Sequence, residues 1–151
     1  MAQLLSNNFG ALEYDDEKRF LFPGGLPGFP EETVFLPIEI PEQLPLLYLQ
    51  SLRTPELCFV TLPVRCVVSD YELAACVDDM TRIGLSPDAR PGPSVLCLAL
   101  ICFGQDGTAA ANLRAPILVN VTNRLAVQTI QYDDQYPIRF PLNVGNGTAP
   151  C

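Results

Sequence analysis

The sequence predicts an all-β single domain with one short helix, on three observations. The chain has 151 residues, a length that suits one hydrophobic core. Its 15 prolines run from Pro23 to Pro150, about twice the usual frequency, and leave little room for long helices. Between them, short apolar segments bounded by Gly, Pro, Asn and Asp recur, which is typical of strands.

The apolar segments are predicted strands, at residues 9–14, 34–38, 46–52, 58–62, 95–103, 115–121 and 125–132. Segment 95–103 does not alternate between apolar and polar residues, so we expect both of its faces to be buried within the monomer, as in a central strand of a barrel or sandwich. Thr122-Asn123-Arg124 separates the last two segments and predicts a hairpin.

One helix is predicted from apolar residues at three- and four-residue spacing, namely Leu73, Cys76, Val77, Met80 and Ile83. Gly84 follows where a C-terminal cap is expected. We predict that the domain spans residues 1–142 and that residues 143–151, which are small and polar, form a mobile C-terminal tail.

The charge balance predicts the kind of partner. The formal net charge is −8, from 17 Asp and Glu against 9 Lys and Arg. Nucleic-acid affinity rests on Lys and Arg that neutralise phosphates, so we expect no direct binding to nucleic acid. A basic protein is the better partner, because opposite fields steer encounter.

The N-terminus and the cysteines predict a cytoplasmic protein. Residues 1–8 contain neither a basic region nor an apolar run of the kind found in signal peptides. The longest apolar run falls far short of the roughly 20 residues of a membrane-spanning helix, so no membrane association is expected. In the cytoplasm the six cysteines are expected to be reduced, buried and inert.

Residues that carry chemistry are sparse, and we expect no enzyme activity, no catalytic residue, no cofactor and no metal. The chain has no histidine, the commonest general base and metal ligand. No glycine-rich phosphate loop and no close cysteine pair of the zinc-binding kind is present. The adjacent acidic pairs, such as Asp78-Asp79, diverge on a strand or helix and are expected to be solvated.

A set of Gly- and Pro-punctuated motifs resembles the flagellar assembly factor FliW family. Phe22-Pro23-Gly24-Gly25-Leu26-Pro27-Gly28-Phe29 resembles its F-P-x-G-L-P-G-F signature, and Leu49-Gln50-Ser51 its L-Q-S element. The similarity continues through residues 55–60, Asp70-Tyr71, residues 111–120, Gln128 and residues 136–139, and covers about residues 9–142. Departures are Tyr48, where tryptophan is frequent, Arg53-Thr54, where an acidic residue is common, and the six cysteines.

The resemblance implies a fold and a function. The fold is a small, mainly antiparallel, β-barrel-like domain. The function is that of a protein that binds flagellin and also binds the translational repressor CsrA, a small basic RNA-binding dimer, so that partner switching controls flagellin translation. An alternative is a secretion chaperone for flagellin that does not act on the repressor. A third is a β-barrel enzyme that uses a residue such as Cys58, Cys66, Cys97 or Asp70.

Seven residues within these motifs are candidate partner contacts: Leu26, Phe29, Tyr48, Gln50, Ser51, Asn112 and Arg114. Each has a structural alternative. Residues 22–29 are favoured as a turn, in which Pro fixes φ and Gly supplies φ > 0. Asn112 is favoured as part of a strand bend that bonds the local backbone. Gln50 and Ser51 could end a strand, Arg114 could pair with a carboxylate, and Tyr48 has the amphipathic ring of an interface residue.

Overall fold

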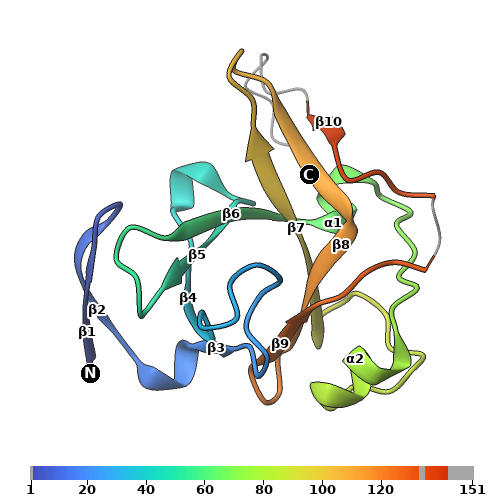
Figure 1. The fold of residues 1–151 in the computed structure, drawn as a ribbon, viewed down its shortest axis with the longest axis horizontal. Coiled ribbons are helices and arrows are strands. Elements are labelled where there is room, and N and C mark those ends of the chain that lie inside the picture. The colour runs from blue at the N-terminus through green and yellow to red at the C-terminus, as the bar shows by residue number, and fades with distance from the viewer. Residues whose placement is uncertain (1, 133–134, 143–151) are drawn as a thin grey trace.

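The computed structural model describes residues 2–132 and 135–142, in which short strands dominate (Figure 1). The strands are β1 (Ala2–Ser6), β2 (Gly10–Tyr14), β3 (Phe20–Leu21), β4 (Val34–Ile38), β5 (Leu47–Ser51), β6 (Cys58–Pro63), β7 (Val95–Phe103), β8 (Ala109–Asn120), β9 (Leu125–Gln128) and β10 (Phe140–Leu142). The helices are α1 (Val64–Val67) and α2 (Val77–Arg82), with 3-10 turns at Asp16–Lys18 and Pro41–Gln43.

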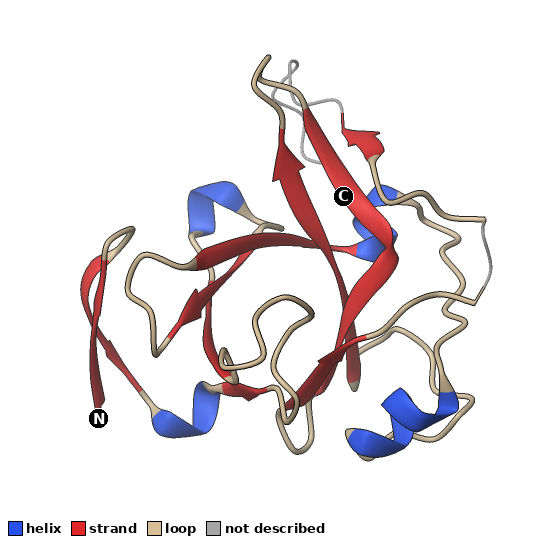
Figure 2. Cartoon of the chain, viewed as in Figure 1, coloured by secondary structure: helices blue, strands red, loops and turns tan. Residues whose placement is uncertain are grey.

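Strands β3 to β9 close into a seven-stranded barrel, which confirms the predicted fold class. Neighbours in the order β8-β7-β6-β5-β4-β3 are antiparallel. The ring closes because β9 pairs with β8 on one side and, in parallel, with β3 on the other, through Leu21 and Leu125. Strand β10 adds to the outer end of β8, and β1 and β2 form a separate hairpin. The helices lie around the ring of strands (Figure 2).

Where β7, β8 and β9 form the barrel wall, both faces are largely buried. One apolar cluster draws residues from β3, β4, β5 and β7 to β9, including Phe20, Phe35, Leu49 and Ile117, and therefore fills the barrel. Leu118, the neighbour of Ile117, belongs to a second cluster, because successive strand residues point to opposite faces.

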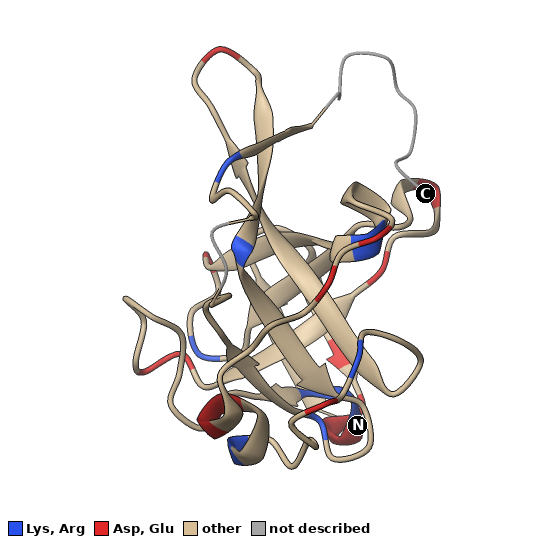
Figure 3. Cartoon of the chain, turned by 90° about the vertical axis from the view of Figure 1, so that its right-hand side faces the viewer, with Lys and Arg blue, Asp and Glu red and all other residues tan. Residues whose placement is uncertain are grey.

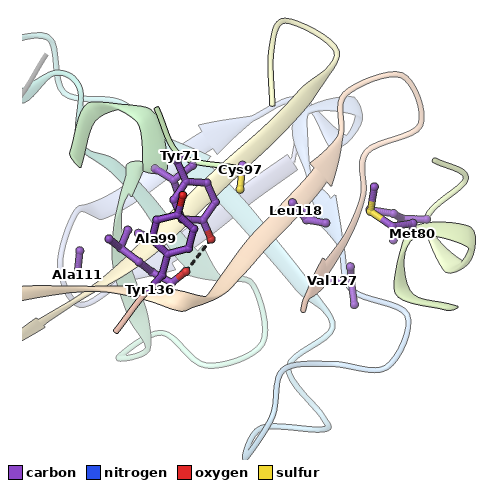
Figure 4. Packing of buried hydrophobic residues seen from close by; sticks show 11 residues of the cluster. Tyr71, Met80, Cys97, Ala99, Ala111, Leu118, Val127 and Tyr136 are labelled. Atoms are coloured by element: carbon purple, nitrogen blue, oxygen red, sulfur yellow. Dashed lines mark hydrogen bonds between the residues drawn. The ribbon is translucent and has the colours of Figure 1, made fainter. Parts of the chain in front are cut away.

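The second cluster lies beneath the segment between β6 and β7. It includes Met80 and Ile83 from that segment, and the rings of Tyr71 and Tyr136 stack with centroids 4.3 Å apart (Figure 4). The Tyr71 hydroxyl donates to the carbonyl of Leu113 at 2.6 Å. Burial of this phenol is the main cause that raises the pKa of Tyr71 well above its ordinary value.

The predicted strand at Val95–Phe103 is present with the same bounds, but the expectation that it is buried throughout is wrong. Residues Val95 to Ala99 are largely buried, whereas Cys102 and Phe103 are exposed. The reason is that β6 pairs with β7 only at Leu98, Ala99 and Leu100, so the far ends of β7 and β8 extend beyond the barrel.

The count of one helix is also wrong, because α1 is a second. The predicted helix at residues 73–83 is the shorter α2, and Gly84 ends it as expected with φ +79°. The N–H of Gly84 donates to Thr81 and that of Leu85 to Met80, a Schellman-type ending. The predicted hairpin between β8 and β9 is confirmed, with Arg124 at φ 64°.

Strands β1, β3 and β10 were not predicted, β8 begins earlier than expected, and β9 ends earlier. The predicted tail at residues 143–151 lies outside the described residues. Within the described part of the chain, no helix is long and apolar enough to cross a membrane.

Candidate protein-binding surface

The loop after β3 contains a tight turn at Leu26-Pro27-Gly28-Phe29. Leu26 and Phe29 exchange backbone hydrogen bonds of 3.1 and 2.7 Å. Pro27 favours the first central position and Gly28 has φ +83°, as a type II turn requires. The structural alternative for this motif is therefore confirmed.

The turn separates its two large apolar side chains. Leu26 is 3% exposed and packs in the barrel cluster, so it has a core role. Phe29 is 42% exposed and meets the ring of Phe59 edge-on, with centroids 5.7 Å apart. Of the two candidates, only Phe29 exposes its side chain to solvent in this conformation.

Gln50 is buried and organises the loop that follows β5. Its amide nitrogen donates to the carbonyls of Ser51, Pro55 and Leu57 at 3.1–3.2 Å. Its Oε1 accepts from the hydroxyl of Ser6 at 2.8 Å. Two of these carbonyls, Pro55 and Leu57, also accept from the backbone N–H groups of Asn7 and Ser51, so the Gln50 amide adds a second hydrogen bond to each.

Ser51 joins the same loop to the segment after the turn. Its hydroxyl donates to Oε1 of Glu32 at 2.5 Å and accepts from the N–H groups of Arg53 and Thr54. The second carboxylate oxygen of Glu32 accepts from the Thr54 hydroxyl at 2.6 Å. Glu32 is itself buried, so the segment after the turn and the loop after β5 meet at one shielded carboxylate.

Tyr48 lies partly exposed on β5. Its ring meets Phe9 edge-on, with centroids 5.4 Å apart, and its hydroxyl donates to the side chain of Gln43. Part of the ring stays available at the surface, so Tyr48 keeps its interpretation as an interface aromatic.

Asn112 and Arg114 lie in an irregular stretch of β8. Residues 113–116 lie between the pairs Leu98↔Ile117 and Leu100↔Asn112, where the register shifts. The side-chain oxygen of Asn112 accepts from the N–H groups of Arg114 and Ala115, which confirms the local bend. The Arg114 Nε donates to the carbonyl of Tyr136 at 3.1 Å.

A groove follows one side of the turn. One pocket of about 330 Å³ lies between residues 23–28 with Pro30, the α2 residues Asp79 and Arg82, and β9. A second, of about 560 Å³, shares Pro27, Asp79 and Gln128 with the first and continues to Ile130 and Tyr132. Both are open to solvent, and apolar atoms dominate the second.

The sequence motifs identified the turn on one side of the groove but not the residues on the opposite side. Ile130 and Tyr132 were assigned to a strand, and Asp79 to the solvated charges. The groove brings together segments near residues 27, 79 and 130, and no local pattern signals that proximity. Glu32 and Ser6 were missed for the same reason.

The cysteines do not behave as one class. Burial raises the pKa of the Cys97 thiol to about 12 and that of Cys58 to about 11, so both stay protonated. The expectation that all thiols are buried is wrong for Cys102, which is exposed. The expectation that all are reduced is wrong for Cys66, which is disulfide-bonded.

Metal-binding side chains are not clustered in the described residues. No set of three His, Cys, Asp or Glu side chains there could hold a metal ion. The positions of Lys, Arg, Asp and Glu are spread over loops, helices and strands of the part that is drawn (Figure 3). The fold and its surface thus define a small, closed β-barrel protein with an apolar groove.

Comparison with known proteins gives the family. The family model described as FliW protein matches residues 3–142. The flagellar assembly factor FliW of Shouchella clausii is 34% identical over 142 residues, which cover 93% of this chain and 94% of that protein. The flagellar assembly factor FliW of Syntrophomonas wolfei is 30% identical over 141 residues, covering 93% and 88%.

A solved structure supports the same family. The crystal structure of the flagellar assembly factor FliW matches with a TM-score of 0.81 and 26% identity, over 94% of this chain and 97% of that chain. The chain belongs to the FliW family of flagellar assembly factors.

Proposed function

We propose that this chain regulates flagellar assembly in the cytoplasm, without catalysis, by binding flagellin and alternatively the repressor CsrA. When secretion removes flagellin, the freed chain binds CsrA and lifts the repression of flagellin translation. Membership of a family of flagellar assembly factors supports the process, and the absence of histidine from the sequence supports a role in binding rather than in catalysis.

The observation that carries the proposal is the display of Phe29 by a rigid turn. The turn is held by two backbone hydrogen bonds, and Leu26 anchors it in the core. An aromatic ring fixed in this way loses little conformational freedom on binding, which is typical of residues that dominate protein interfaces. The net charge of −8 favours a basic second partner such as CsrA.

Titration calorimetry tests the proposal. The purified chain is titrated with a CsrA dimer and separately with flagellin, each at low and at moderate salt. We expect binding to both, with the CsrA complex weakened by salt. Binding to flagellin alone would replace the proposal with the chaperone function. Binding to neither would mean that the chain shares only its fold with the FliW family, and not this function.

Site variants test the surface itself. Phe29→Ala is expected to weaken the affinity for at least one partner by about tenfold. Phe103→Ala is the matched control, because Phe103 is also an exposed phenylalanine but lies at the far end of β7. Equal affinities for both variants and the wild type would remove Phe29 from the interface.

A further inference from the structure

Two of the most exposed large hydrophobic side chains border one pocket. Ile130 is 65% exposed and Tyr132 is 71% exposed, and both line the larger pocket of the groove together with Pro27 and Ala115. Large apolar side chains gathered at a concave surface are typical of a binding site, whereas single exposed ones are ordinary.

The wall that carries Ile130 and Tyr132 is held in place from behind. The N–H of Tyr132 donates to the carbonyl of Ala74 at 3.1 Å. The side chain of Gln131 accepts from the N–H of Ala74 at 2.6 Å and donates to the carbonyl of Glu72 at 2.8 Å. The exposed side chains are therefore mounted on a fixed backbone, which reduces the ordering cost of binding.

Side-chain hydrogen bonds also fix residues 128 and 129, which lie between the two walls of the groove. The hydroxyl of Thr129 donates to the Asp79 carboxylate at 2.7 Å, which joins α2 to the segment after β9. The amide of Gln128 donates to the carbonyl of Ala115 at 3.0 Å. The opposite wall is the turn at Pro27, whose conformation Pro and Gly fix.

Two acidic residues of α2 lie at the groove: Asp79 lines both pockets, and Asp78, its neighbour in the first turn of α2, is exposed. The pKa of the Tyr132 phenol is raised, mainly by its hydrogen bond and charge interaction with Cys76, then by desolvation, and least by the carboxylates of Asp78 and Asp79. Arg82, the cation that borders the groove, lies in the other pocket. The end that presents Ile130 and Tyr132 is thus both apolar and negative.

We propose that this end of the groove binds a basic segment of a protein partner, which inserts an apolar side chain between Pro27 and Tyr132 and places Lys or Arg beside Asp78 and Asp79. The inference rests on the proposed function and locates the contact with its basic partner. Charge complementarity favours this occupant over a second copy of the chain, which carries the same net charge of −8.

Paired substitutions test the apolar part of this assignment. Ile130→Ser is expected to weaken binding to the CsrA dimer by tenfold or more in calorimetry. Leu5→Ser is its matched control, because Leu5 is 68% exposed on the separate hairpin, and it should stay within threefold of the wild type. Circular dichroism and thermal unfolding confirm that both variants fold.

A second pair tests the charge. Asp78→Lys and Glu13→Lys change the net charge equally, and both side chains are exposed. We expect Asp78→Lys to weaken CsrA binding about tenfold more than Glu13→Lys and to reduce its salt dependence. Equal effects would show that only the overall charge matters and would overturn the assignment.

The remaining outcomes are distinguishable. Wild-type binding to CsrA that Ile130→Ser leaves unchanged overturns the groove assignment while the proposed function stands. A wild-type chain that binds neither CsrA nor flagellin overturns both. Sedimentation identifies the other occupant, because a wild-type dimer that Ile130→Ser dissociates, with CsrA affinity unchanged, would make the groove a contact between copies.

Discussion

Ser6 and Gln50 belong to different sheets and are joined by a hydrogen bond of 2.8 Å between their side chains. Ser6 ends β1 in the N-terminal hairpin, whereas Gln50 lies in the barrel strand β5. The Ser6 hydroxyl also accepts from the N–H groups of Asn8 and Phe9 at the tip of the hairpin. The side chain of Gln50 thus connects the hairpin, the barrel and the loop after β5.

Gln50→Leu is expected to lower the free energy of unfolding by about 2–3 kcal/mol, because the substitution removes the side-chain hydrogen bonds to three loop carbonyls and leaves the buried Ser6 hydroxyl without an acceptor. Urea denaturation measures the loss. Gln3→Leu is the control: it makes the same chemical change at an exposed position of β1 and should shift stability by less than about 0.5 kcal/mol. Equal losses would refute the connecting role of Gln50.

Glu32→Leu is expected to cost about 1–3 kcal/mol of stability, because it leaves the buried hydroxyl of Ser51 and the half-buried hydroxyl of Thr54 without an acceptor. Glu31→Leu is the neighbouring control. Glu31 pairs with Arg53 at 3.0 Å in solvent, and such exposed pairs contribute about 0–1 kcal/mol. If chemical denaturation shows a larger loss of stability for Glu31→Leu than for Glu32→Leu, the buried carboxylate of Glu32 is not what joins the two loops.

Gly25→Ala is expected to destabilise the chain more than Gly28→Ala. Both glycines have positive φ, so each alanine costs about 1–2 kcal/mol of backbone strain. A Cβ at Gly25 would also lie 2.5 Å from the carbonyl oxygen of Pro30, whereas a Cβ at Gly28 would meet nothing within 4 Å. The difference between the thermal midpoints of the two variants measures the effect of the steric clash at Gly25. Equal midpoints would show that the loop relaxes to remove the clash.

Cys97 should make stability fall at alkaline pH. Burial raises the pKa of Cys97 from an ordinary thiol value of 9.0 to about 12, so the folded state holds the thiol proton more tightly. The contribution is complete below pH 9 and is lost as the pH rises from 9 toward 12. Urea midpoints of wild type and Cys97→Ala across that range test this expectation, and a slope that the variant does not reduce contradicts it.

The strand pattern was largely predictable because apolar segments between Gly and Pro are a local signal. Val34–Ile38 and Val95–Phe103 were located with the same bounds as in the structure. Helix α1 was missed, because Val64–Val67 is a single turn with too few residues for a helical period. Strand β3 has two residues and forms only where β4 and β9 flank it.

The candidate residues were found through motifs, yet their roles depend on tertiary contacts. Leu26, Gln50 and Ser51 lie in the interior, so direct contact with a partner would require the loops around them to open. Phe29 and Tyr48 keep exposed surface, and their partner contact stays a prediction. A motif shows that residues belong together, but burial decides which of them reach the surface.

Closure of the barrel through Leu21 and Leu125 bears on synthesis of the protein on the ribosome. Strand β3 emerges early, but it has no β9 to pair with until most of the chain has been translated. The groove follows the same order, since Pro27 forms one wall and Ile130 and Tyr132 the other. A nascent chain, or a fragment that stops before β9, therefore has neither the closed barrel nor the groove, so the groove becomes available only when translation of the chain is nearly complete.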